Sequence, residues 1–206
     1  MAGQPLINSG ATKEKLRAPV WWFADVAVPS SGTVVTLAAE SGGSGWKTPD
    51  ATENPNAICI GCTDDFDING EQAYDKDYCQ QFAAPIGVFA GDLTMSVELP
   101  IVGAINSALM AKLHSATVTT VSSTTLIQGG SLDVLPSMAI LGVFKMQNDP
   151  TKFGYILFLN CNQVMAWNAK GVSRKKFARS SVKFEALTLS GRAPGKDVYE
   201  VALVAA

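Results

Sequence analysis

The acidic stretch DDFDINGEQAYDK, residues 64–76, holds more side chains able to ligate a metal ion than any other part of the chain. Asp65, Asp67 and Asn69 stand at alternate positions, as at the start of an EF-hand calcium loop. Such a loop needs a bidentate carboxylate at its twelfth position, and Lys76, a cation, stands there instead. The sequence therefore predicts no calcium site in this stretch.

The same stretch carries a turn signal. Asn69-Gly70 lies between two alternating runs, and both residues tolerate the positive φ that a two-residue hairpin turn requires. We therefore expect a hairpin over Ile58 to Cys79 with its turn at Asn69-Gly70.

The four cysteines and the single histidine are the other potential metal ligands. Cys59 and Cys62 have the spacing of half a zinc site, but no second pair follows, since Cys79 and Cys161 stand alone. His114, in an expected helix, adds no second pair. We expect buried thiols, with a disulfide or a metal site as the alternatives.

No arrangement of residues indicates catalysis. A Ser-His-Asp or Cys-His site would depend on His114, whose helical neighbours offer no partner, so we interpret it as a surface histidine. Asp64 and Asp65 are adjacent carboxylates that an exposed hairpin would leave solvated. The glycine cluster Ser41 to Gly45 lacks the Lys-Ser/Thr of a P-loop. We expect a protein that is not an enzyme and holds no cofactor.

The composition is that of one folded domain. The chain has 206 residues, 47% of them apolar, which is enough for a substantial core. Its net charge of -2 indicates no general electrostatic partner. No apolar run approaches the roughly 20 residues of a membrane helix, and Asp25 and Pro29 interrupt the run that begins at Val20. We expect neither membrane insertion nor a signal peptide, and synthesis in a cytoplasm.

The hydrophobic pattern predicts mostly β structure. Residues 1–19 lack periodicity and are expected to form an extended N-terminal arm before a single domain over 20–206. A long loop over 39–57 contains Trp46 and is expected to dock onto something. The expected strands are 20–28, 33–37, the hairpin 58–79, 86–99, 138–146, 153–167, 180–189 and 196–204.

The strand over 86–99 changes parity in its middle. Apolar residues up to Ala90 fall on one face, whereas those from Leu93 onward fall on the other. Gly91-Asp92 lies at the change, so we predict a β-bulge there.

One amphipathic helix is predicted, over about residues 100–114. Pro100 suits the first helical position, and one apolar stripe follows at helical spacing: Ile101, Ile105, Ala108, Leu109 and Leu113. The Ser- and Thr-rich tract 115–125 favours extended chain. The expected fold is an antiparallel β-sandwich or barrel with one flanking amphipathic α-helix.

Charge is segregated along the chain. Residues 63–79 hold six acids against Lys76 alone, and residues 170–183 hold six basic residues and no acid. Three interpretations stay open: unrelated solvated faces, complementary patches between identical subunits, or a nucleic-acid-binding patch.

The order of these features resembles the tail-tube (major tail) proteins of long-tailed bacteriophages, whose fold is similar to the tube protein of type VI secretion. The similarity of layout covers about residues 20 to 205, and the tract 115–125 has no place in it. The shared features are the arm, the long early loop, the acidic strand ICIGCTDDFDINGEQ, the long strand VFAGDLTMSVELP before the helix, and the C-terminal strands YILFLNCNQVMAW and SVKFEALTLSG.

The resemblance implies hexameric rings whose inner strands join into one barrel, stacked into a hollow tube that passes DNA. The arm and long loop would bridge rings, and no catalytic residue carries over. Implied partners are other copies of the chain, tape-measure and terminator proteins, and DNA in passage, in a virion tail assembled in the host cytoplasm. The candidate subunit, ring or lumen contacts are Trp46, Asp64, Asp65, Asp67, Arg174, Lys175, Lys176 and Arg179.

Two alternatives stay open beside this resemblance. One is a capsid decoration or head–tail connector protein. The other is a β-sandwich module that binds a ligand or glycan, with Trp21, Trp22, Trp46 and Trp167 as stacking aromatics.

Overall fold

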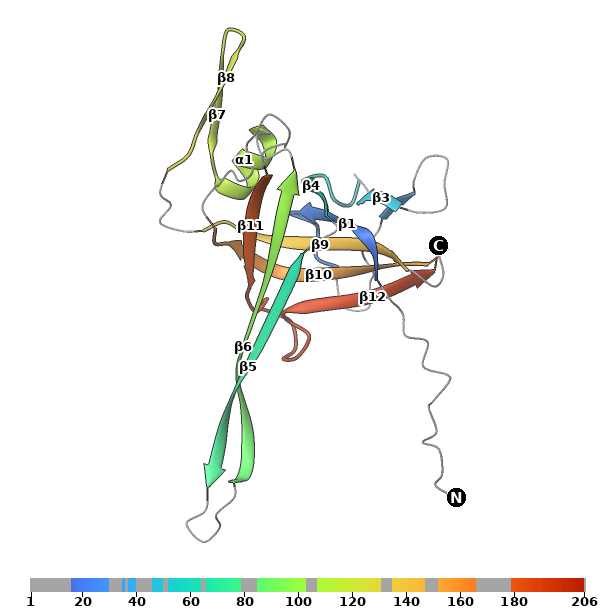
Figure 1. The fold of residues 1–206 in the computed structure, drawn as a ribbon, viewed down its shortest axis with the longest axis vertical. Coiled ribbons are helices and arrows are strands. Elements are labelled where there is room, and N and C mark those ends of the chain that lie inside the picture. Colours follow the sequence, from blue (N-terminus) through green and yellow to red (C-terminus); the bar gives the residue numbers. More distant parts are fainter. Residues whose placement is uncertain are drawn as a thin grey trace.

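The protein folds into a mostly β structure with one short helix, as expected (Figure 1). The computed structural model describes residues 16–29, 35, 37–39, 46–49, 52–63, 66–78, 85–102, 107–130, 135–146, 152–165 and 179–205. Within these ranges the elements are β1 (Leu16–Ala24), β2 (Leu37–Ala39), β3 (Trp46–Pro49), β4 (Ile58–Thr63), β5 (Asp67–Tyr78), β6 (Pro85–Val102), α1 (Ser107–His114), β7 (Thr117–Val121), β8 (Thr124–Gln128), β9 (Ser137–Met146), β10 (Lys152–Gln163), β11 (Arg179–Ala186) and β12 (Tyr199–Ala205).

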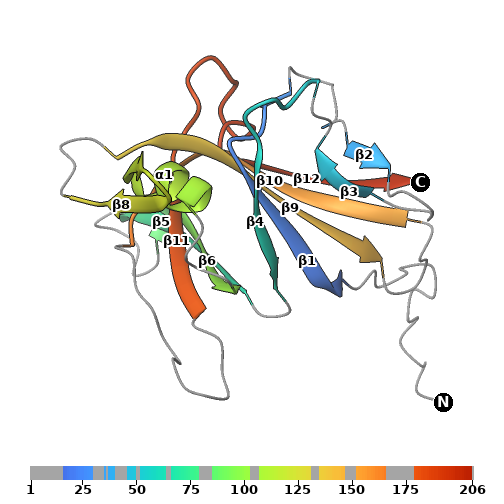
Figure 2. The same ribbon diagram turned by 90° about the horizontal axis from the view of Figure 1, so that it is seen from above.

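One antiparallel sheet organises the domain, in the order β4-β1-β9-β10-β11-β6-β5, with β12 also paired to β10. Strand β10 changes partner along its length, because Lys152–Phe158 pair with β12 and Cys161–Gln163 pair with β11. A register shift against β9 lies between Phe158 and Cys161, where the partner changes. As a result β11, β6 and β5 run crosswise to β9 and β10 (Figures 1 and 2), as at the corner of an orthogonal sandwich.

The principal core lies between the two crossing parts of the sheet and includes Trp22, Phe158 and Phe184, all almost fully buried. Trp22 meets the Phe66 ring edge-on, with centroids 5.3 Å apart. Gly142 is the direct partner of Trp22 on β9, and a Cβ there would lie 2.6 Å from the indole ring. The glycine therefore makes room for the largest side chain of the core.

A second core covers the opposite face of β1, β9 and β10 and includes Phe23, Leu141 and Tyr155. Every residue of β9 from Met138 to Phe144 is buried, because the strand has a core on each side. This explains why its sequence is a continuous apolar run rather than an alternating one.

The helix flanks the sheet, but it begins seven residues later than Pro100, where the sequence placed its start. Pro100 and Ile101 belong to β6, opposite Ser181 and Ser180 of β11, so strand pairing outweighs the local preference of proline for a helix start. Within α1, Leu113 is buried in the principal core. An ion pair between Lys112 and Asp25 joins the helix to the end of β1.

The turn predicted at Asn69-Gly70 is wrong. Both residues lie within β5, opposite Ser96 and Met95 of β6, and Gly70 does not have a positive φ. The hairpin expected over 58–79 is wrong for the same reason, because β4 pairs with β1 whereas β5 pairs with β6. The long strand β6 provides backbone hydrogen-bonding partners for Asn69 and Gly70 and keeps them in a strand. The local sequence does not reveal this partner.

Other strand and loop boundaries also differ from those predicted from the sequence. Strand β1 begins at Leu16, inside the range expected for the arm, and ends at Ala24 rather than Val28. The loop expected over 39–57 contains β3, which pairs with β2. The C-terminal strands fall where the sequence placed them, with ends shifted by a few residues.

Candidate interaction surface

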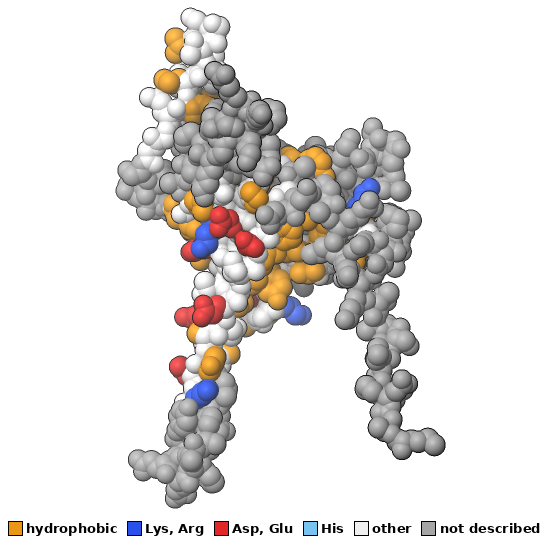
Figure 3. Space-filling model, viewed as in Figure 1, with side chains coloured by type: hydrophobic (Ala, Val, Ile, Leu, Met, Phe, Trp, Pro, Cys, Tyr) orange, Lys and Arg blue, Asp and Glu red, His pale blue; other side chains and the backbone are white. Residues whose placement is uncertain are grey.

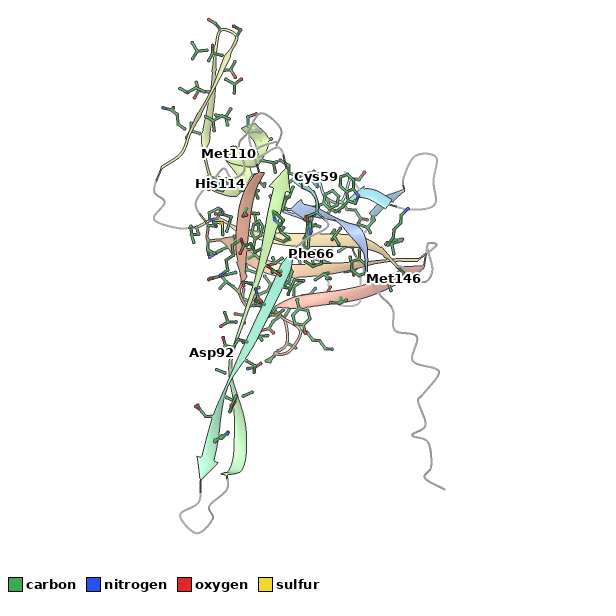
Figure 4. All side chains as sticks on the ribbon, viewed as in Figure 1. Cys59, Phe66, Asp92, Met110, His114 and Met146 are labelled. Carbon is green, nitrogen blue, oxygen red and sulfur yellow. The ribbon has the colours of Figure 1, made fainter. Side chains whose placement is uncertain are left out.

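Strands β5 and β6 leave the sheet together as a long two-stranded ribbon (Figure 1). At its base, Ile68 and Val97 are direct partners and contribute to the principal core. Farther along, the described side chains of Asn69 to Lys76 are exposed. Phe66 lies at the base of the ribbon, whereas Asp92 lies on the part that projects below the sheet (Figure 4). We name the projecting part, residues 69–76 with 90–96, the β5–β6 ribbon.

One face of the β5–β6 ribbon, here called the apolar face, exposes Tyr74 and Leu93. Gln72 and Lys76 lie on it too, and the Lys76 Nζ is 5.5 Å from the Tyr74 ring centroid. Direct cross-strand partners share a face, and so do residues two apart on one strand. This places Tyr74 and Leu93 on the face that begins with Val97 in the core. The exposed fraction rises outward along this face, from 1% at Val97 to 39% at Leu93 and 60% at Tyr74. The core face of the sheet therefore continues onto the ribbon and becomes exposed.

The bulge predicted at Gly91-Asp92 is confirmed, and it keeps this face continuous. Gln72 pairs with Leu93 and Tyr74 with Ala90, so the two residues between oppose Ala73 alone. The extra residue brings Ala90 back to the face of Leu93, which a regular strand would not do. The Gln72 side chain donates a hydrogen bond to the Gly91 carbonyl at the bulge.

The opposite face of the ribbon and its base is acidic. Alternation places Asp67, Glu71 and Asp75 of β5 together, and the register puts Glu98 directly opposite Asp67. Asp92 joins them, because it lies next to Leu93 and so points to the other side. Figure 3 shows acidic side chains along the length of the ribbon. Like charges directly opposite one another are unfavourable in a sheet, so this face keeps its acids at a cost in stability.

One basic residue of the 170–183 run lies beside the acidic face within the same chain. Lys183 of β11 is the register partner of Glu98, and its Nζ is 4.0 Å from a carboxylate oxygen of Glu185. The acids at the base of the ribbon therefore have a cation nearby, whereas Glu71 and Asp75 lie farther along.

The residues proposed from the sequence are only partly within the described ranges. Asp67 is exposed on the acidic face, Trp46 begins β3 and Arg179 begins β11. Asp64, Asp65, Arg174, Lys175 and Lys176 lie outside the described residues, as does Trp167. Of the acidic and basic candidates, the structure describes Asp67 on β5 and Arg179 on β11, with β6 between these two strands.

One of the four tryptophans proposed to stack on a ligand, Trp22, is not available at the surface. Trp22 is 1% exposed and forms part of the core, so it cannot stack on a ligand. Trp21, its neighbour on the other face of β1, is 37% exposed.

Sequence reasoning missed Tyr74 and Leu93 as surface residues. The signal was present in the predicted bulge, since a bulge at Gly91-Asp92 places both apolar runs of β6 on one face. The wrong prediction of a turn at Asn69-Gly70 prevented this inference, because a turn there would leave no β5 strand to pair with β6.

Among the titratable groups of the described residues, His114 and Cys161 have a pKa shifted by burial. No group of three or more His, Cys, Asp and Glu side chains in the described ranges is placed to hold a metal ion. Burial lowers the pKa of His114, which is half-buried rather than at the surface as predicted. Burial raises the pKa of Cys161 to about 12, so its thiol is protonated at neutral pH. Cys161 is buried as expected, but Cys59 is exposed, against the prediction.

No described helix is long and apolar enough to cross a membrane. No protein-family model and no curated protein matches the chain.

Proposed function

We propose that this protein is a structural virion subunit that assembles with copies of itself into stacked rings, which form the tail tube of a long-tailed bacteriophage. The rings are hexameric in this proposal, and DNA passes through their centre. Its other partners are the tape-measure and terminator proteins of the tail. The proposal begins from the resemblance in the order of sequence features and gains support from the surface of the β5–β6 ribbon.

The observation that carries the proposal is the uncovered apolar face of this ribbon. An isolated two-stranded ribbon is only marginally stable in water. Here the ribbon also exposes Tyr74 and Leu93 on the face that continues the core. Full burial of a side chain of this size contributes about 1.5–3 kcal/mol. A neighbouring subunit that covers this face would supply the missing packing.

The acidic face supports the same arrangement. When the apolar face packs against a neighbour, the opposite face, with Glu71 and Asp75, turns away from that contact. In the proposed ring, we assign this acidic face to the central channel. Carboxylates there repel the DNA phosphates and let the polymer move without adhering.

Negative-stain electron microscopy of the purified full chain tests the proposal. We expect rings with a central pore, or tubes built from them. A chain that stays monomeric at high concentration, by microscopy and by sedimentation, would rule the tube out.

A pair of matched variants connects the outcome to the ribbon. Tyr74→Ser with Leu93→Ser removes the exposed apolar face, and we expect a folded subunit that no longer forms rings. Asn69→Ser with Thr94→Ser changes two exposed residues of the opposite face and serves as the control, with rings expected. Equal assembly by both variants would separate ring formation from the apolar face.

A further inference from the structure

The Ser- and Thr-rich tract forms a second projecting hairpin, which the proposed function does not use. Strands β7 and β8 pair only with each other among the described strands, and the chain turns at Ser122-Ser123. This hairpin projects from the end of the molecule opposite the β5–β6 ribbon (Figure 1). Every residue of β7 is exposed, and on β8 only Ile127 is partly covered.

The β7–β8 hairpin lacks the features that protect exposed strand edges. Natural edges carry charges, prolines or bulges that block pairing with another chain. Residues 115–130 contain no charged residue and no proline, and the register of the hairpin is uninterrupted. Val118, Val121 and Leu126 are exposed on it, at 37%, 63% and 47%. A two-stranded ribbon of this kind is expected to gain stability from a third strand.

Three edges of the large sheet are open among the described strands, and two of them are protected. The β5 edge carries the charges of Asp67, Glu71 and Asp75. The β4 edge has a register shift at Ile60-Gly61, where Gly61 has a φ of 136°. Both features discourage the addition of a strand.

The β12 edge is the unprotected one. Its seven residues pair with β10 without a register shift. Its one charged side chain, Glu200, is held by an ion pair with Arg192. Tyr199 and Val201 are 45% and 57% exposed.

The open backbone groups of β12 can be identified. Leu159 N–H donates to the Val198 carbonyl at 3.0 Å, which makes this a hydrogen-bonded pair. Such pairs alternate with non-bonded ones in an antiparallel ladder. Tyr199 and Val201 therefore direct their N–H and C=O groups away from β10, toward the open edge.

We propose that the β7–β8 hairpin of one copy adds to the β12 edge of a second copy as an extra pair of strands. The two elements lie on different sides of one molecule in both views (Figures 1 and 2), so a chain cannot make this contact with itself. Two different surfaces that meet in this way form a head-to-tail contact, which closes into a ring when the rotation permits. The role of this contact in a ring rests on the proposed function, but the contact itself is tested independently of ring formation.

Disulfide capture between two differently sized copies tests the contact. One copy carries Thr119→Cys in β7 and the other carries Val201→Cys in β12, both with Cys59→Ser. We expect a cross-linked product in several-fold excess over a control pair that combines Thr119→Cys with Glu71→Cys on the charged β5 edge. Equal yields from the two pairs would overturn the proposed contact.

A proline substitution gives a second test. Val201→Pro removes an N–H that faces the open edge and leaves the bonds to β10 in place, whereas Val201→Thr keeps that N–H. We expect the proline variant to remain folded and to lose association in sedimentation, and the threonine variant to associate normally. Rings from the folded proline variant would overturn the contact and leave the tube proposal standing. If the cysteine pair cross-links specifically but the unmodified chain forms no rings, the contact is supported and the tail-tube proposal is overturned.

Discussion

At the scale of single residues, Gly142 shows how one missing side chain fixes the principal core. A Cβ at this position would lie 2.6 Å from the Trp22 ring, and Trp22 is almost fully buried. Overpacking of this kind costs roughly 1–3 kcal/mol. We expect Gly142→Ala to lower the free energy of unfolding by about that amount in urea titrations.

Gly130→Ala is the matched control, because a Cβ there meets nothing within 4 Å. Its unfolding midpoint should stay within experimental error of the unmodified protein. Equal destabilisation by the two substitutions would mean that the tight contact with Trp22 is not the cause.

The thiol of Cys161 provides a second test at this scale. Burial raises its pKa to about 12 from an ordinary value of 9.0, and only the thiolate attacks thiol reagents. In the folded protein at pH 8, we expect peptide mapping to find Cys59 modified and Cys161 unmodified. Rapid modification of Cys161 without unfolding would contradict its burial.

The same shift has a consequence for stability. The pKa of Cys161 is higher in the folded state than in the unfolded state. Its contribution to the free energy of unfolding is therefore complete below about pH 9 and is lost as the pH rises toward 12. We expect the urea midpoint to fall with pH in this window, and to fall less steeply in Cys161→Ala.

At the scale of elements, Gly70 distinguishes the strand from the turn. In a hairpin turn it would need a positive φ, and a substitution would introduce strain. Within β5 its φ is ordinary, and a Cβ would meet Met95 only at 3.7 Å, a normal contact. We expect Gly70→Ala to raise stability by roughly 0.4–1 kcal/mol, because it restricts the unfolded chain. A loss of stability of Gly70→Ala in thermal melts would instead support a turn at Asn69-Gly70.

This position also shows where sequence reasoning was limited. The bulge at Gly91-Asp92 could be predicted because it follows from the parity of one strand, and the apolar run of β9 reveals a buried strand by itself. The partner of Gly70 is Met95 of β6, 25 positions away in the chain (95 − 70), and no local pattern specifies this pairing. Pro100 was misassigned for the same reason, since its partner Ser181 belongs to β11.

The candidate surface was predicted in part. The sequence indicated its acids, and Asp67 lies on the acidic face of β5 as a strand residue. The sequence did not indicate Tyr74 or Leu93, because their exposure depends on how far the ribbon extends beyond the core. Burial at one end of a strand and exposure at the other leave the same alternating pattern in the sequence.

At the scale of the whole molecule, the acidic face distinguishes two kinds of assembly. If it faces a channel, Glu71→Lys with Asp75→Lys replaces phosphate repulsion by attraction without removing a subunit contact. We expect tubes of normal length that retain nuclease-protected DNA, a retention that weakens with salt because charge–charge interactions are screened. Glu53→Lys, exposed outside the ribbon, is the control and should give tubes without DNA.

If the acids instead pair with the basic run of a neighbouring subunit, the same double variant should weaken assembly itself. Each exposed pair contributes only about 0.2–1 kcal/mol, so the loss would be partial and would grow with salt in the unmodified protein. Adding Arg174→Glu, Lys175→Glu and Lys176→Glu to the lysine variant would then restore the tubes, because the pairs would re-form with reversed signs. Tubes that assemble normally and trap DNA assign the acids to the channel, whereas rescue by the second set of reversals assigns them to the subunit interface.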